Sequence, residues 1–162
     1  MANKDQPKGF EPFGRVLRVN EYDAGAIIYP GDLVKLKADG TVEPAAASNA
    51  VCGVALSYAA SGAKVLVADD PNQLIKGQVN GSSIDAATDL NLNYNISVGT
   101  ASTLYKRSAM EIDHTSGATT STLPLKVIQV YKETDNALGA DVDVVCIINN
   151  HQFKGGTGAE GV

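Results

Sequence analysis

The sequence contains no tryptophan and no long apolar run, and it has no apolar segment near its N-terminus. Its longest uninterrupted apolar stretch, residues 144–148, is five residues long, whereas a membrane-spanning helix needs about 20. The missing apolar segment at the start also argues against a signal peptide. We therefore expect a soluble protein with no membrane partner.

A cluster of basic residues is also missing. Thirteen Lys and Arg residues face eighteen Asp and Glu residues, which gives a formal net charge of −5. Proteins that bind nucleic acid usually present a clustered basic surface, because neutralising phosphates supplies most of the affinity. We expect the charges to lie on solvated faces, and we expect no nucleic-acid partner.

Residues that bind metals are scarce as well. The two cysteines, Cys52 and Cys146, each lie in an apolar, strand-like run. This favours buried free thiols, although a disulfide between them stays open. The only histidines, His114 and His151, have no second His or Cys at the spacing of metal ligands. We predict no metal site.

Catalytic motifs are equally hard to find. Asp141 and Asp143 flank Val142, a spacing that would place both carboxylates on one face of a strand. Such a pair could serve a glycosidase or bind calcium, but nothing else in the sequence supports either. No serine lies in a G-x-S-x-G motif. We predict no catalytic residues and no enzyme; a hydrolase that uses Asp141, Asp143 or His114 is the least favoured alternative.

Glycines are abundant, and three of them form a G-x-G-x-x-G pattern in the final segment, FKGGTGAEGV. In a dinucleotide site this pattern opens a helix, and an acidic residue follows about 20 positions later. Here one residue follows the last glycine, Gly161. The pattern therefore predicts no cofactor, and we expect a flexible Gly-rich tail.

Short β-branched runs between turn signals dominate the remainder. Residues 33–36 alternate and lead into Asp39-Gly40, which predicts a hairpin with a type I′ turn. Residues 51–58 and 64–69 read as two further strands that could pair, and residues 15–19 read as a half-buried strand. About ten such strands without an amphipathic helix predict an all-β protein.

We divide the chain at Asp70-Pro71, where proline interrupts the strand pattern. The expected parts are two small antiparallel β-barrel or β-sandwich domains between an arm and a tail. They are an extended N-terminal arm at 1–13, a β domain at 14–70, a second β domain at 71–154 and a flexible tail at 155–162. Domains this small bury a modest share of their surface, so association into an oligomer would add stability.

The arm and the residues after it hold an unusual share of the basic and aromatic side chains. Residues 4–19 contain four of the thirteen Lys and Arg residues and two of the three phenylalanines. Phe10 and Phe13 could pack on their own domain or on a neighbouring surface. We take the second possibility as the working hypothesis, and its candidate contact residues are Lys8, Phe10, Phe13, Arg15 and Arg18.

Two stretches carry a resemblance to a known family. Residues 29–79 begin with YPGD and contain an Asp-Gly turn, an Ala-rich loop and Asp-Pro-Asn-Gln. Residues 122–153 contain a closing strand that leads into Asn-Asn-His. Together they resemble the capsid decoration, or cement, proteins of tailed bacteriophages. The resemblance implies a small β fold without enzymatic activity or cofactor, and an N-terminal arm that contacts the shell or a neighbouring subunit.

The resemblance also implies partners and a location. Such proteins bind the outer surface of an icosahedral head, often as homotrimers, and stabilise contacts between major capsid subunits. We therefore expect the major capsid protein and further copies of this chain as partners, and we expect a protein made in the host cytoplasm and located on the capsid exterior. The alternative is a small β-barrel module that binds oligonucleotides or carbohydrate. Only Tyr94, Tyr105 and Tyr131 are plausible stacking platforms for it.

Overall fold

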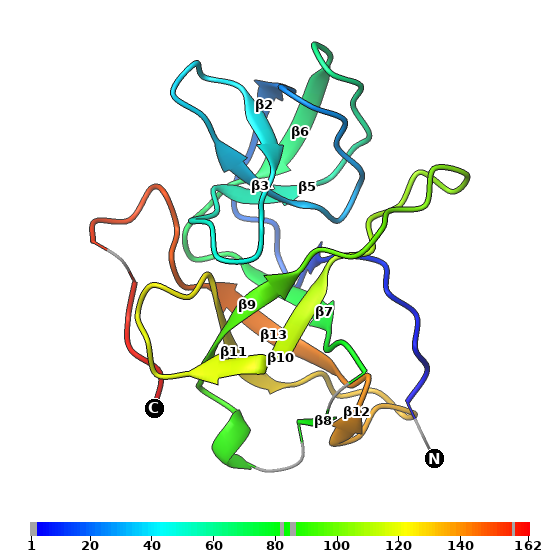
Figure 1. Cartoon of the computed structure of the whole chain (residues 1–162), viewed down its shortest axis with the longest axis vertical. Helices are drawn as coiled ribbons and strands as arrows, with labels where there is room; N and C mark the ends of the chain where they lie inside the picture. The colour runs from blue at the N-terminus through cyan, green and yellow to red at the C-terminus, as the bar shows by residue number, and fades with distance from the viewer. Residues whose placement is uncertain (1–2, 82, 85–86, 157) are drawn as a thin grey trace.

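The computed structural model describes residues 3–81, 83–84, 87–156 and 158–162. The described chain forms a five-stranded and a six-stranded antiparallel sheet, which Figure 1 shows one above the other. This confirms the all-β prediction, and the two sheets make a sandwich-like arrangement without closing into a barrel.

The five-stranded sheet has the order β2-β6-β5-β3-β4. Its strands are β2 (Val19–Asp23), β3 (Leu33–Leu36), β4 (Val42–Pro44), β5 (Gly53–Ala55) and β6 (Lys64–Ala68). The expected hairpin is therefore present, because β3 pairs with β4. The second expected pairing is also confirmed, because β5 lies antiparallel to β6.

The six-stranded sheet has the order β1-β7-β13-β11-β9-β10. Its strands are β1 (Glu11–Pro12), β7 (Leu74–Gln78), β9 (Asn93–Ser97), β10 (Glu111–Ala118), β11 (Leu125–Val130) and β13 (Asp143–Ile148). Two shorter strands, β8 (Ser83–Ile84) and β12 (Gly139–Ala140), pair with each other, and a single 3₁₀ turn, η1, spans Ala87–Asp89. The edge strand β1 comes from the N-terminal arm, so the arm is part of this sheet.

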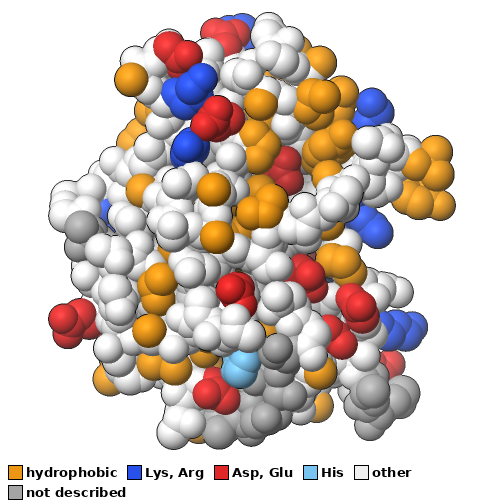
Figure 2. All heavy atoms as spheres, viewed as in Figure 1, with side chains coloured by type: hydrophobic (Ala, Val, Ile, Leu, Met, Phe, Trp, Pro, Cys, Tyr) orange, Lys and Arg blue, Asp and Glu red, His pale blue; other side chains and the backbone are white. Residues whose placement is uncertain are grey.

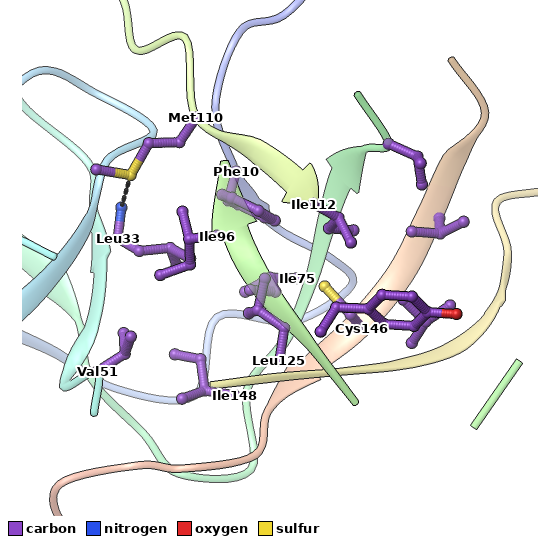
Figure 3. Packing of buried hydrophobic residues seen from close by; sticks show 14 of the residues in the cluster. Phe10, Leu33, Val51, Ile75, Ile96, Met110, Ile112, Leu125, Cys146 and Ile148 are labelled. Atoms are coloured by element: carbon purple, nitrogen blue, oxygen red, sulfur yellow. Dashed lines mark hydrogen bonds between the residues drawn. The ribbon is translucent and has the colours of Figure 1, made fainter. Parts of the chain in front are cut away.

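The larger hydrophobic core lies on the six-stranded sheet and is shared with the other one. Its members include large side chains such as Ile75, Ile112 and Tyr94, and Leu33 and Val51 enter it from the first half of the chain. Figure 3 shows Leu33, Ile75 and Ile112 among the side chains of this core, with the backbone amide of Leu33 donating to the sulfur of Met110 at 3.2 Å. Burying side chains of this size stabilises a fold by roughly 1.5–3 kcal/mol each. The two sheets therefore depend on one another.

The smaller core is made of shorter side chains. It collects buried alanines and valines of the five-stranded sheet, together with Ile28 and Cys52. Cys52 and Cys146 are both buried free thiols, as predicted. A core of small residues buries less apolar surface per residue, so contact with the larger core matters more for this sheet.

The predicted type I′ turn at Asp39-Gly40 is wrong in its details. Gly40 is left-handed at φ +82°, but Asp39 is not, whereas a type I′ turn needs both. Instead Lys37 N donates to Thr41 O and Gly40 N donates to Lys37 O. This is the longer hairpin loop that combines a type I turn with one left-handed glycine. The Asp39 carboxylate accepts hydrogen bonds from the Thr41 amide and hydroxyl and fixes the loop.

The strand predicted at residues 15–19 is also misplaced, because β2 begins at Val19. The amide of Leu17 donates to the side chain of Gln73 and not to a neighbouring strand. The side chain of Arg18 turns to Asp69. Side-chain partners thus replace the ladder that the alternating pattern suggested.

The Gly-rich tail, which we expected to lie free, returns to the body of the molecule. Gly161 N donates to Thr119 O at 2.9 Å, and Val162 N donates to Asn91 O at 3.1 Å. A Cβ added to Gly161 would lie 3.0 Å from the carbonyl oxygen of Ala118. The glycine therefore permits a close backbone approach, a packing role that composition alone does not indicate.

Candidate functional site

Both histidines pack against other side chains of the fold. Among the residues that the structure describes, no group of three or more His, Cys, Asp or Glu side chains could hold a metal ion. His151 is 1% exposed, and its Nδ1 accepts a hydrogen bond from Phe153 N. Burial, helped by the charge of Lys154, lowers the pKa of His151 to about 4. The ring of His114 stacks on Tyr94 at a centroid distance of 6.2 Å.

A buried carboxylate, Asp69, organises the start of the five-stranded sheet. It accepts hydrogen bonds from Arg18 Nε at 2.8 Å, Asn20 Nδ2 at 2.8 Å and Tyr22 Oη at 2.5 Å. Burial alone would raise the pKa of Asp69, but these donors outweigh it and hold the pKa below its usual value. Burial, with Asp69 nearby, raises the pKa of Cys52 to about 12, so the thiol is not an activated nucleophile. The cluster fits a structural role.

Asp141 and Asp143 do line one hollow, but only Asp143 belongs to a strand. Asp141 precedes β13 in a left-handed conformation at φ +54°, and its carboxylate accepts from Gly81 N at 2.8 Å. Nearby, burial and then the charges of Asp5 and Asp141 raise the pKa of Glu111 to about 7. Several carboxylates therefore gather on this side of the molecule.

We call this hollow the acidic hollow. Its volume is about 310 Å³. Four acids line it against two lysines, and the acids are Glu133, Asp135, Asp141 and Asp143. Glu133 and Asp135 are exposed at its mouth. Figure 2 shows acidic side chains gathered on the lower right of the molecule.

The five residues that we predicted as contacts lie in different environments. Phe10 is 2% exposed and belongs to the larger core, so its side chain offers no outer surface. Phe13 packs edge-on against Tyr131, with ring centroids 5.9 Å apart. Arg18 binds Asp69 and lies over the ring of Phe153 at 5.6 Å. Lys8 lines the acidic hollow, and Arg15 is exposed.

Two of the three most exposed large apolar side chains among the described residues lie elsewhere, in a hairpin that projects from the body between β9 and β10 (Figure 1). The third is the C-terminal Val162. We call residues 102–107 the projecting hairpin. Leu104 is 79% exposed and Tyr105 is 74% exposed. From the sequence we named only Tyr105 of this segment, as a possible stacking platform. A further signal is the large apolar pair Leu104-Tyr105 followed directly by Lys106 and Arg107.

The projecting hairpin is ordered by its own hydrogen bonds. Ser102 N donates to Arg107 O at 2.8 Å, and Arg107 N donates back to Ser102 O at 3.1 Å. The hydroxyl of Ser102 accepts from Tyr105 N at 3.2 Å. Lys106 then lies 4.0 Å over the ring of Tyr58, which ties the tip to the loop between β5 and β6. Large apolar side chains held in water in this way are typical of a protein-binding surface.

No protein-family model and no curated protein matches this chain. Within the described ranges, no helix has the length and apolar character needed to cross a membrane.

Proposed function

We propose that this protein is a structural decoration protein that binds the outer surface of an icosahedral phage head and stabilises contacts between major capsid subunits. The two stretches that resemble such proteins support the proposal, because they lie side by side in the fold. Strand β13, from the second stretch, pairs along β7, from the first. Val51 N, in the first stretch, also donates to Asn150 O, in the second. The resemblance thus covers one continuous body.

The observation that carries the proposal is the projecting hairpin. A protein that works by attachment needs a stiff body and an exposed apolar contact that is already ordered, because ordering a loop on binding weakens affinity. The hairpin offers Leu104 and Tyr105 on such a body. Many modest contacts, repeated over a symmetric shell, add up by multivalency.

In this proposal the protein acts outside the shell, as a homotrimer, and needs no cofactor or reaction centre. Exposed Arg15 and the exposed surface around Lys8 stay candidates for shell contact. Phe10 is excluded, because it is committed to the core.

Co-sedimentation with expanded heads that lack decoration tests the proposal. We expect the purified protein to pellet with the heads at saturating, stoichiometric occupancy and to raise the temperature at which the heads are disrupted. A variant with Leu104→Ser and Tyr105→Ser should bind more weakly. A matched variant with Ile27→Ser, an exposed apolar residue of the other half, is the control. Protein that stays in the supernatant with expanded heads would overturn the proposal.

A second candidate, an oligonucleotide-binding module, gains support from one observation. Exposed Tyr105 adjoins Lys106 and Arg107, and bases stack on such aromatic and cationic surfaces. Tyr94, in contrast, is buried and cannot serve as a platform. Binding of single-stranded DNA that weakens steeply with salt would favour this candidate over the first.

A further inference from the structure

We infer that the projecting hairpin of one copy binds the acidic hollow of a second copy, so that this pair of surfaces joins the protomers of the oligomer. The inference deepens the proposed function by naming the surfaces that the copies use on each other. It can be tested on the purified protein alone, without a shell.

The hairpin has the form of an anchor. Its tip is closed by two backbone hydrogen bonds between Ser102 and Arg107, and Lys106 adopts a left-handed φ of +51° at the turn. The anchoring contact of Lys106 with Tyr58 leaves Leu104 and Tyr105 pointing into solvent. Little conformational entropy is lost when such a pre-formed tip enters a partner.

The positive charge of the projecting hairpin indicates that it binds an acidic surface. Residues 98–108 contain Lys106 and Arg107 and no acidic residue, whereas the chain as a whole carries a net charge of −5. The basic hairpin of one copy is therefore complementary in charge to the acidic surface of another copy. Complementary potentials steer association and fix its register.

The acidic hollow is the surface on this chain that fits the tip. Its exposed carboxylates, Glu133 and Asp135, can accept from exposed Arg107, and arginine forms bidentate pairs with carboxylates. Lys106 stays over Tyr58 and contributes its positive charge. Tyrosine is amphipathic, so Tyr105 can place its ring in the hollow and donate its hydroxyl to a carboxylate. Leu138, next to this segment, is 48% exposed and can cover Leu104.

The two surfaces lie apart on one molecule, as Figure 1 shows: the hairpin projects at the upper right, and the N-terminus and β12 lie at the lower right. A contact between two different patches is heterologous, and it closes into a ring when the rotation between copies allows it. A closed ring of three copies pairs every hairpin with a hollow, as the proposed homotrimer needs. In such a ring the hairpin variant binds heads more weakly because it loses the multivalency of the trimer, and not because it loses a direct contact with the shell.

Light scattering over a range of protein concentrations measures the association. We expect the wild-type chain to have the mass of an oligomer. Lys106→Glu with Arg107→Glu, and separately Glu133→Lys with Asp135→Lys, should each weaken association by about tenfold or more. The hairpin variant Leu104→Ser with Tyr105→Ser should do the same without a change of charge.

Combining both charge reversals in one chain is the decisive variant, because it restores complementary charges at the contact. We expect it to recover the oligomer, since the two pairs of substitutions act on one interaction. The matched control is Lys37→Glu with Lys64→Glu, which changes the net charge as much as the hairpin reversal but lies outside both surfaces. It should associate like the wild type. Circular dichroism spectra confirm that each variant is folded.

A monomeric wild-type protein would overturn the inference, and so would an oligomer whose combined variant is no better than the single reversals. A monomer whose hairpin variant loses binding to heads would show that the shell, and not a second copy, receives the hairpin. Failure of self-association with intact head binding would therefore leave the proposed function standing while this inference fell.

Discussion

The N-terminal arm and the projecting hairpin have similar compositions and opposite roles. Both combine large apolar side chains with Lys or Arg. In the arm, Phe10 is 2% exposed and packs inside the larger core, whereas in the hairpin Leu104 is 79% exposed. The arm completes the fold, and the hairpin stays available to a partner.

An aromatic and basic composition therefore does not by itself identify a contact surface. What decides is whether the fold offers a space for the aromatic ring. Gly77 in β7 provides that space, because a Cβ at this position would lie 2.3 Å from Cε1 of Phe10. No comparable space receives Leu104, because its hairpin is closed on itself and held away from the cores.

The largest expected effect comes from emptying the space in the core. Phe10→Ala should lower the free energy of unfolding by about 3–5 kcal/mol, because it removes a buried ring and leaves a cavity. Tyr105→Ala, an equally drastic truncation in the hairpin, should change it by less than about 0.5 kcal/mol. Urea denaturation followed by circular dichroism measures both. Equal losses from the two variants would refute the contrast.

The next effect comes from filling the space that receives Phe10. Gly77→Ala should destabilise the fold by about 1–3 kcal/mol, because the new methyl group overpacks the site. Gly155→Ala is the matched control, because a Cβ there would meet nothing within 4 Å. If Gly77→Ala and Gly155→Ala unfold at the same urea concentration, Phe10 is not packed against β7.

A pH effect tests how the arm lies beside Glu111. The pKa of Glu111 is raised from 4.5 to about 7 by burial and by Asp5 and Asp141. The folded state therefore holds this proton more tightly than the unfolded state, and the stability that this contributes below about pH 4.5 is lost as the pH rises through 7. Glu111→Gln should remove that loss and raise stability at pH 8 by about 1–2 kcal/mol relative to the wild type.

Urea denaturation at pH 5 and pH 8 measures this difference. Glu133→Gln, an exposed acid, serves as the control and should leave the pH dependence of stability unchanged. A wild-type protein whose stability rises between these two pH values, with Glu111→Gln following it in parallel, would contradict the assignment.

The smallest expected effect on stability comes from the hairpin itself. Leu104→Ser with Tyr105→Ser should leave the melting temperature almost unchanged, because both side chains are already exposed to water. The same variant should lose association, as proposed above. A large drop in melting temperature would mean that the hairpin stabilises its own fold, and the contrast with the arm would fail.

The sequence predicted the features that depend on local patterns. Alternating apolar residues and a turn glycine predicted the hairpin of β3 and β4, and strand-like apolar runs predicted that Cys52 and Cys146 are buried. Partners distant in sequence decided the rest. In the segment expected to be a strand at residues 15–19, Leu17 and Arg18 form hydrogen bonds with the side chains of Gln73 and Asp69 and not with a neighbouring strand. No local pattern reveals these partners.

The candidate site was harder to predict for the same reason. Whether Phe10 or Tyr105 is exposed depends on which strand packs against it, and the pairing of β1 with β7 joins residues more than sixty positions apart. The acidic hollow likewise brings the residues after β11 beside the start of the arm. Tail packing depends on close backbone approaches at glycine, and glycine-rich composition is equally common in free termini.

Electron microscopy of expanded heads, with and without added protein, tests the proposed function most directly. We expect additional density of the size of this chain at symmetry-related positions on the outer surface, bridging neighbouring major capsid subunits. A head whose outer surface is identical with and without saturating protein would contradict it.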